Sequence, residues 1–131
     1  MPPTRLSTAV LDCADAHELA AFYRALLGYG VRAEEPDWVL TGPPEGTPGL
    51  SLAFQTEPEY IPPVWPSRAP GAQQMMLHLD IQVDDLPGET ARAVGLGARL
   101  ADHQPQDDVR VLFDPAGHPF CLWTESEAQA Q

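Results

Sequence analysis

The stretch LHLDIQVDDL, residues 77–86, carries a histidine inside a strand-like pattern. Side chains of a strand change face at every step, so Asp80 and Gln82 are predicted to share the face of His78. An imidazole beside a carboxylate can ligate a metal ion, contact a substrate or exchange a proton. It can also only fill space, with Asp80 pairing a neighbouring polar group. The choice depends on what the fold brings to the same face.

The other histidines and the cysteines offer less. His17 is expected in the first turn of a helix, His103 at a strand end or in a loop, and His118 in a turn. None of them has a partner at metal-site spacing. Cys13 and Cys121 lie in apolar, strand-like surroundings, which predicts two buried free thiols and no disulfide framework.

Composition limits the classes of function. With 131 residues, the chain is predicted to be a single domain, and its 44% hydrophobic and 20% charged residues are typical of a folded protein. The formal net charge of -12 argues against nucleic-acid binding and favours a cationic ligand, although acidity also keeps a protein soluble. No apolar run reaches the ~20 residues that span a membrane, and the N-terminus lacks the apolar core of a signal peptide. We therefore expect a cytoplasmic protein without a membrane partner.

The elements that must position these residues repeat along the chain. Asp15 and Asp85 each precede a helical pattern, where a carboxylate can accept hydrogen bonds from free amides, and Gly28 and Gly97 end the two patterns. Placing the two aspartates together sets Thr8 opposite His78. The predicted helices cover residues 16–28 and 84–97, and the predicted strands cover residues 5–13, 30–35, 37–42, 50–55, 75–83, 98–103, 108–113 and 119–125.

This pattern predicts an α+β fold of two β-α-β-β-β modules. Module 1 covers about residues 4–56 and module 2 about residues 74–125, and both belong to the single domain 1–131. Residues 57–73 form a proline-rich linker between them, semi-rigid and suited to a lid or a dimer contact.

Three segments in this order resemble the vicinal-oxygen-chelate superfamily, which includes glyoxalase I, the bleomycin-resistance proteins and the extradiol dioxygenases. They are LDCADAHELAAFYRALLG, LHLDIQVDDL with its following helix, and DPAGHPFCLW. More narrowly, the chain is similar to a glyoxalase-like domain subgroup abundant in actinobacteria. The resemblance implies a cupped half-barrel sheet built from the two modules, whose concave face holds a metal or a ligand, and it implies a homodimer.

Metal-dependent members of the superfamily bind a divalent ion at four positions inside the cup. The resemblance places these positions at Thr8, Gln55, His78 and Cys121. His78 suits a metal, Gln55 offers only a neutral oxygen, and a neutral hydroxyl such as that of Thr8 is a very weak ligand. Because Cys121 stands where relatives have a carboxylate, none remains to offset the charge of the ion. We therefore expect no cofactor; if a divalent metal binds, His78 and Gln55 hold it.

Without a metal the same cup is a pocket for a small molecule. Pockets of this kind are mostly apolar, with a few convergent polar groups. Each aromatic candidate also has a packing role as its alternative, and Trp123 is a further such candidate. The predicted floor is Thr8, Gln55, His78 and Cys121, and the predicted wall is Trp38, Phe54, Tyr60 and Trp65.

We therefore predict a metal-free protein that binds a small organic molecule and sequesters a cationic drug or metabolite, as the resemblance to bleomycin-resistance proteins implies. The main alternative is a metal-dependent lyase, isomerase or dioxygenase with His78 as the principal ligand. Two further alternatives are a metal-free acid–base role for His78 and a structural dimeric module with a small, sealed cup.

Overall fold

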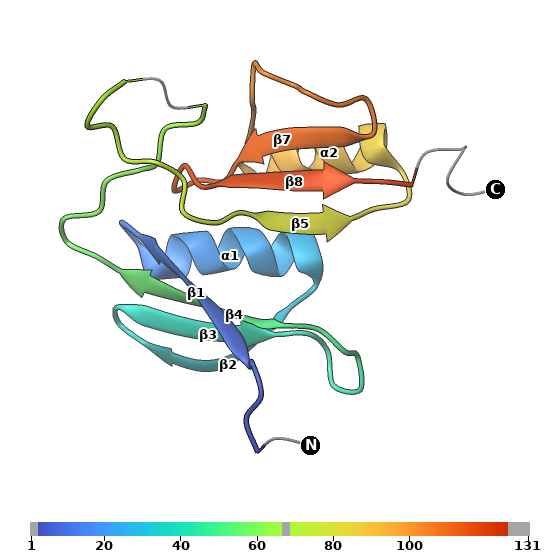
Figure 1. Ribbon diagram of the computed structural model, residues 1–131. Helices are drawn as coiled ribbons and strands as arrows, with labels where there is room; N and C mark the ends of the chain where they lie inside the picture. Colours follow the sequence, from blue (N-terminus) through green and yellow to red (C-terminus); the bar gives the residue numbers. More distant parts are fainter. Residues whose placement is uncertain (1–2, 67–68, 126–131) are drawn as a thin grey trace. The chain divides into compact units, whose positions relative to one another are not determined.

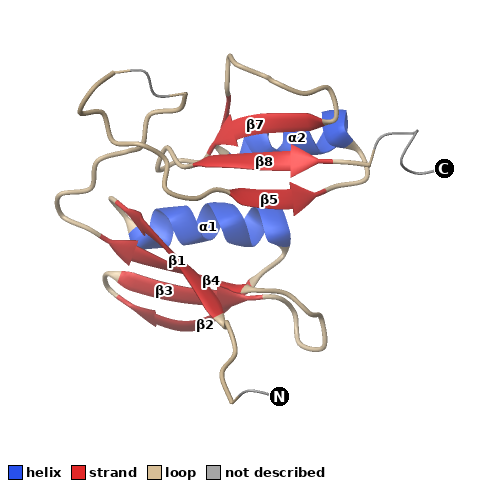
Figure 2. Cartoon of the chain, in the orientation of Figure 1, coloured by secondary structure: helices blue, strands red, loops and turns tan. Residues whose placement is uncertain are grey.

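The computed structural model describes residues 3–66 and 69–125 and divides the chain into two compact units between Tyr60 and Ile61. Each unit contains the elements β-α-β-β-β in this order. Figures 1 and 2 show their course along the chain, where the two-residue strand Arg99–Leu100 carries no label. We call them the first unit, up to Tyr60, and the second unit, from Ile61. The predicted α+β fold of two repeated modules is therefore confirmed.

The first unit packs one helix on a mixed sheet with the strand order β1-β4-β3-β2. β1 runs parallel to β4, and the other two pairs are antiparallel. Phe54 of β4 is fully buried and stacks on Tyr23 of α1, with ring centroids 5.7 Å apart. The elements are β1 (Thr8–Cys13), α1 (Ala16–Leu27), β2 (Gly30–Glu35), β3 (Trp38–Gly42) and β4 (Ser51–Thr56).

The second unit repeats this plan with the strand order β5-β8-β7-β6 and the same parallel pairing of its first and last strands. Leu112, Phe120 and Leu122 have no exposed surface, and neither has Ala93 of α2. By alternation, Cys121 and Val111 point to the other face of this sheet. The elements are β5 (Leu79–Gln82), α2 (Leu86–Leu96), β6 (Arg99–Leu100), β7 (Val109–Phe113) and β8 (Pro119–Trp123).

The helix caps follow the sequence. The Asp15 carboxylate accepts hydrogen bonds from the amides of His17 and Glu18, and the Asp85 carboxylate accepts one from Gly88. Gly28 caps α1 with a φ of 73°, in the left-handed region that favours glycine. The predicted caps are confirmed, and α2 begins at Leu86, two residues later than predicted.

β1 begins at Thr8 instead of residue 5, β8 ends at Trp123 instead of residue 125, and two strands of the second unit, β5 and β6, are shortened more strongly. β5 begins at Leu79 instead of residue 75, so His78 lies just before the strand. The register pairs Leu79 with Phe120, which places His78 opposite Pro119. Because proline has no amide hydrogen, it cannot donate to an extended ladder at this point.

β6 contains only Arg99 and Leu100, although a strand over residues 98–103 was predicted. Beyond Leu100, the side chain of Gln104 makes the hydrogen bonds that further residues of β6 would make with β7. Its amide nitrogen donates to the carbonyls of Ala101 and Val111, and its oxygen accepts from the amide of Val111, all at 2.8–2.9 Å. A side chain therefore satisfies the backbone groups that a longer strand would pair.

Neither cysteine forms a disulfide, as predicted, but only Cys13 is buried, and Cys121 is half-buried. In the described part of the chain, no helix has the length and apolar character that crossing a membrane requires.

Candidate functional site

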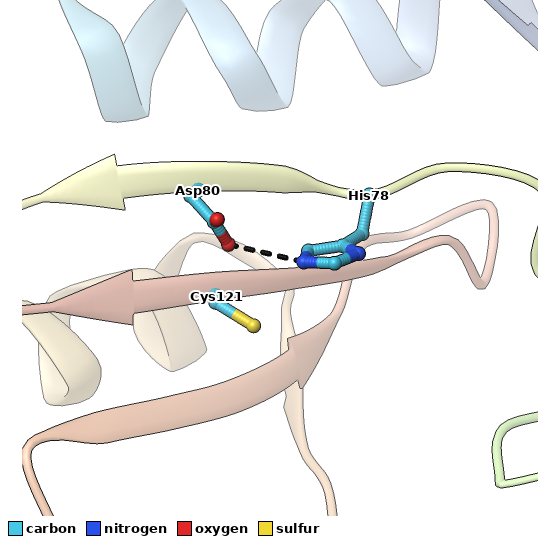
Figure 3. Close-up of side chains that lie close together, drawn as sticks. All are labelled: His78, Asp80 and Cys121. Atoms are coloured by element: carbon cyan, nitrogen blue, oxygen red, sulfur yellow. Dashed lines mark ion pairs between the residues drawn. The ribbon is translucent and has the colours of Figure 1, made fainter.

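His78, Asp80 and Cys121 gather on the face of the second unit's sheet that lies opposite α2. His78 and Asp80 are two positions apart, so both side chains leave the chain on the same side, and the strand register pairs Asp80 with Cys121. His78 Nε2 lies 3.1 Å from Asp80 Oδ1. Figure 3 shows the ring and the carboxylate pointing toward one another, with the thiol coming from β8. Local alternation and strand pairing together assemble this cluster.

The cluster is open on one side and apolar on the other. The side chains of His78 and Asp80 are 39% and 61% exposed. Cys121 instead packs with Trp65 against Ala101, Val111 and Phe113. The thiol therefore sits between an apolar wall and a solvent-facing ion pair.

This position controls the chemistry of the thiol. Burial, the negative charge of Asp80 and the hydrogen bond that the thiol donates to its carboxylate together raise the pKa of Cys121 from 9.0 to about 11, with burial as the largest cause. The thiol therefore keeps its proton at neutral pH. Such a group is a poor nucleophile, because the thiolate is the reactive form.

Trp65 comes from the loop between the repeated elements. Its ring centroid lies 5.5 Å from that of His103, tilted by 42°. A β-bridge between Val64 and Gln74 joins two positions of this loop. Trp65 thereby covers part of the second unit's sheet beside Cys121, and His103 lies in a loop, as predicted.

The first unit has a cavity of its own. Its volume is about 320 Å³, and Glu35, Asp37, Trp38 and Gln55 line it. Trp38 of β3 pairs with Gln55 of β4 and with Glu35 of β2, so three of the four residues form one row across the sheet. Asp12 of β1 pairs with Gln55 and extends this row by a further carboxylate.

Comparison with known proteins identifies the family. A sequence model of the family described as "Glyoxalase-like domain" matches residues 8–123, from the start of β1 to the end of β8. The chain belongs to the glyoxalase-like domain family. The predicted vicinal-oxygen-chelate superfamily is thereby confirmed, and no curated protein matches this glyoxalase-like chain.

Solved structures share the fold of this glyoxalase-like domain. A glyoxalase/bleomycin resistance protein/dioxygenase family enzyme from Burkholderia phytofirmans is 16% identical, with 92% of this chain and 98% of that chain covered and a TM-score of 0.69. The antibiotic binding protein TnmS3 from a Streptomyces species is 19% identical, with 96% of this chain and 99% of that chain covered and a TM-score of 0.62. A bleomycin resistance determinant encoded on the transposon Tn5 is 22% identical, with 94% of this chain and 99% of that chain covered and a TM-score of 0.59. Identities this low establish the fold alone.

The superfamily-type metal set does not fit the residues of this glyoxalase-like domain. Thr8 offers a neutral hydroxyl, 3.2 Å from that of Ser7, and Gln55 offers a neutral amide. Neither can balance the charge of a divalent ion, and none of the four expected positions holds a carboxylate. Asp80, which the superfamily pattern does not place among these positions, supplies the carboxylate beside His78.

The structure distributes the other predicted pocket residues of the glyoxalase-like domain over different surroundings. Trp38 and Gln55 share the cavity of the first unit, and Trp65 packs in the second unit. Phe54 faces α1 and is fully buried, so it does not line an open face, contrary to the expectation. Tyr60 is half-buried at the end of the first unit. The sequence pattern missed Glu35 and Asp37, whose link to Trp38 follows from strand pairing.

Proposed function

We propose that this protein binds a small organic cation in the cavity of the first unit, and that this binding needs no metal ion. The observation that carries the proposal is the cavity itself, with its volume of about 320 Å³. This volume lies at the lower end of the range for small-molecule sites, roughly 300–1,000 Å³.

The lining of the cavity matches a cation. Among the described residues, those that line it include the indole of Trp38 and the carboxylates of Glu35 and Asp37, and no basic side chain. An indole attracts a cation through its ring quadrupole, and carboxylates add Coulomb attraction. The amide of Gln55 can donate or accept one hydrogen bond and so orient the ligand. The formal net charge of -12 adds long-range attraction for the same sign of ligand.

Two proteins that share the fold are named for antibiotics. One is a bleomycin resistance determinant and another an antibiotic binding protein. What these two proteins are named for makes a cationic drug or metabolite the first ligand class to test on this chain. We further propose that the protein acts as a homodimer.

Isothermal titration tests the proposal with a bleomycin-type antibiotic and with choline as a minimal cation. Dimethylbutanol, the neutral carbon isostere of choline, is the matched ligand control. We expect the cations to bind and the neutral isostere not to. Trp38→Leu should weaken binding about tenfold, because a cation–π contact contributes roughly 1–2 kcal/mol. Added salt should weaken it further.

Matched variants separate the cavity from the rest of the surface. Trp123→Leu removes a half-buried tryptophan of the second unit, and Glu18→Gln removes an exposed carboxylate outside the cavity. Both should bind the cations like the wild type. Absence of binding at high micromolar ligand, or equal losses in Trp38→Leu and Trp123→Leu, would contradict the proposal.

A further inference from the structure

The second unit carries three side chains of different ligand chemistry at one point. The imidazole of His78, the carboxylate of Asp80 and the thiol of Cys121 each offer one ligand atom, and these atoms all lie within 4.8 Å of one another. They come from two hydrogen-bonded strands and the residue just before one of them. The backbone of a paired sheet therefore fixes where the three side chains start.

A zinc-sized ion fits this arrangement with small adjustments. Zinc bonds of about 2.0–2.3 Å in tetrahedral geometry separate the ligand atoms by roughly 3.3–3.8 Å. His78 Nε2 and Asp80 Oδ1 are already closer than that, at 3.1 Å. The remaining approach needs side-chain rotation of about 1 Å, and His78 and Asp80 are exposed enough to rotate. No movement of the sheet is required.

We infer that His78, Asp80 and Cys121 form a binding site for a divalent ion of intermediate softness, zinc in the first place, within the second unit. Nitrogen, oxygen and sulfur ligands together are typical of zinc and exclude magnesium and calcium, which prefer oxygen alone. Binding releases the thiol proton of Cys121 to solvent and leaves the anions of Asp80 and the thiolate to balance the ion.

The surroundings agree with a site open to one further ligand. Three protein ligands leave the fourth tetrahedral position free, as in zinc sites that bind water or a substrate. The solvent-facing side of His78 and Asp80 gives an ion a path of entry, and the apolar wall of Val111 and Trp65 supports the sulfur. This site goes beyond the proposed function and does not depend on it, because the cation cavity lies in the first unit.

Cobalt titration of the full chain tests the site directly. Co²⁺ replaces Zn²⁺ in such sites, and its bond to a thiolate gives a charge-transfer absorption in the near ultraviolet. We expect this band to appear with one ion per chain and to disappear when Zn²⁺ is added. Cys121→Ser should abolish the band, and His78→Ala and Asp80→Asn should each weaken cobalt binding at least about tenfold.

Three matched variants serve as controls. Cys13→Ala removes the other thiol, Asp84→Asn removes an exposed carboxylate near Asp80 in sequence, and Trp38→Leu alters the cavity of the first unit. All three should keep the band, with unchanged circular dichroism confirming the fold. A band that survives Cys121→Ser, cobalt binding unaffected by Asp80→Asn, or no band at millimolar Co²⁺ would overturn the inference. Choline titrations of Cys121→Ser report on the cavity separately.

Discussion

The pKa of Cys121 can be tested by measuring how fast the thiol reacts. Burial and the neighbouring carboxylate of Asp80 raise this pKa from 9.0 to about 11. Both influences disfavour the thiolate, because it is an anion placed in an apolar wall and beside another anion. Replacing Asp80 by asparagine removes the charge and leaves the burial. We therefore expect Asp80→Asn to lower the pKa part of the way toward 9.0.

The size of the effect follows from the fraction of thiolate. At pH 8 a thiol of pKa 9 is roughly 10% ionised, whereas a thiol of pKa 11 is roughly 0.1% ionised. A more basic thiolate is also more nucleophilic, which returns a factor of about eight for two pKa units. Cys121 should therefore react with iodoacetamide about tenfold more slowly than an unperturbed thiol at this pH.

The assay is alkylation of the Cys13→Ala protein, which leaves Cys121 as the one thiol in the chain. A chelator keeps metal ions away. Between pH 7 and 10 the logarithm of the rate should rise with a slope near one and without a plateau. In Asp80→Asn the same plot should bend at lower pH, whereas the control Asp84→Asn should follow the parent. A wild-type plateau centred near pH 8.5–9, or an unchanged profile in Asp80→Asn, would refute the reasoning.

Three further predictions concern stability and assembly. Phe54→Ala should lower the free energy of unfolding by about 3–5 kcal/mol, whereas its exposed neighbour Gln55→Ala should change it by less than about 0.5 kcal/mol, both measured in urea. Asp15→Ala should cost about 1 kcal/mol in the same assay, because two helix amides lose their acceptor, and Asn at this position should restore most of it. Sedimentation should show a homodimer at micromolar concentration that covers part of the exposed apolar surface, where Leu6 and Met76 are 81% and 88% exposed; a monomer at all concentrations would contradict this.

The repeated elements could be predicted from the sequence because their signals are local. An aspartate before an amphipathic run and a glycine after it determine a helix by contacts within a few residues. Asp15, Asp85 and Gly28 act in the structure as the pattern indicates. Family membership followed from the same segments in the same order.

The ends of two strands could not be predicted because they depend on distant partners. β5 starts at Leu79 because Pro119, some forty positions later, cannot extend the ladder. β6 ends early because the side chain of Gln104 binds the backbone of Val111. Neither event has a signature in the residues of the strand itself.

The strand register shows that Gln55 and Cys121, which the family resemblance places at equivalent positions of the two modules, are not equivalent. Gln55 pairs with Asp12, whereas Cys121 pairs with Asp80. When Asp15 is placed on Asp85, Asp80 corresponds to Val10 and not to Asp12. Cys121 therefore corresponds to Ala53, and the counterpart of Gln55 is Trp123. The expected ligand set thus combined different rows of the two sheets.

The different positions of these residues in the two sheets explain why the two units, which share one fold, have different functional side chains. The row that holds Asp80 and Cys121 in the second unit holds Val10 and Ala53 in the first, which have no metal-ligating side chains. Conversely, the cavity of the first unit is lined by the row of Gln55 and Trp38, which lies two residues further along β4 than the row of Ala53. A repeat of the fold therefore does not repeat a site, and each site must be derived from its own sheet. It follows that the cation cavity and the proposed zinc site can be altered independently. Trp38→Leu should weaken cation binding and keep the cobalt band, whereas Cys121→Ser should abolish the cobalt band and keep cation binding.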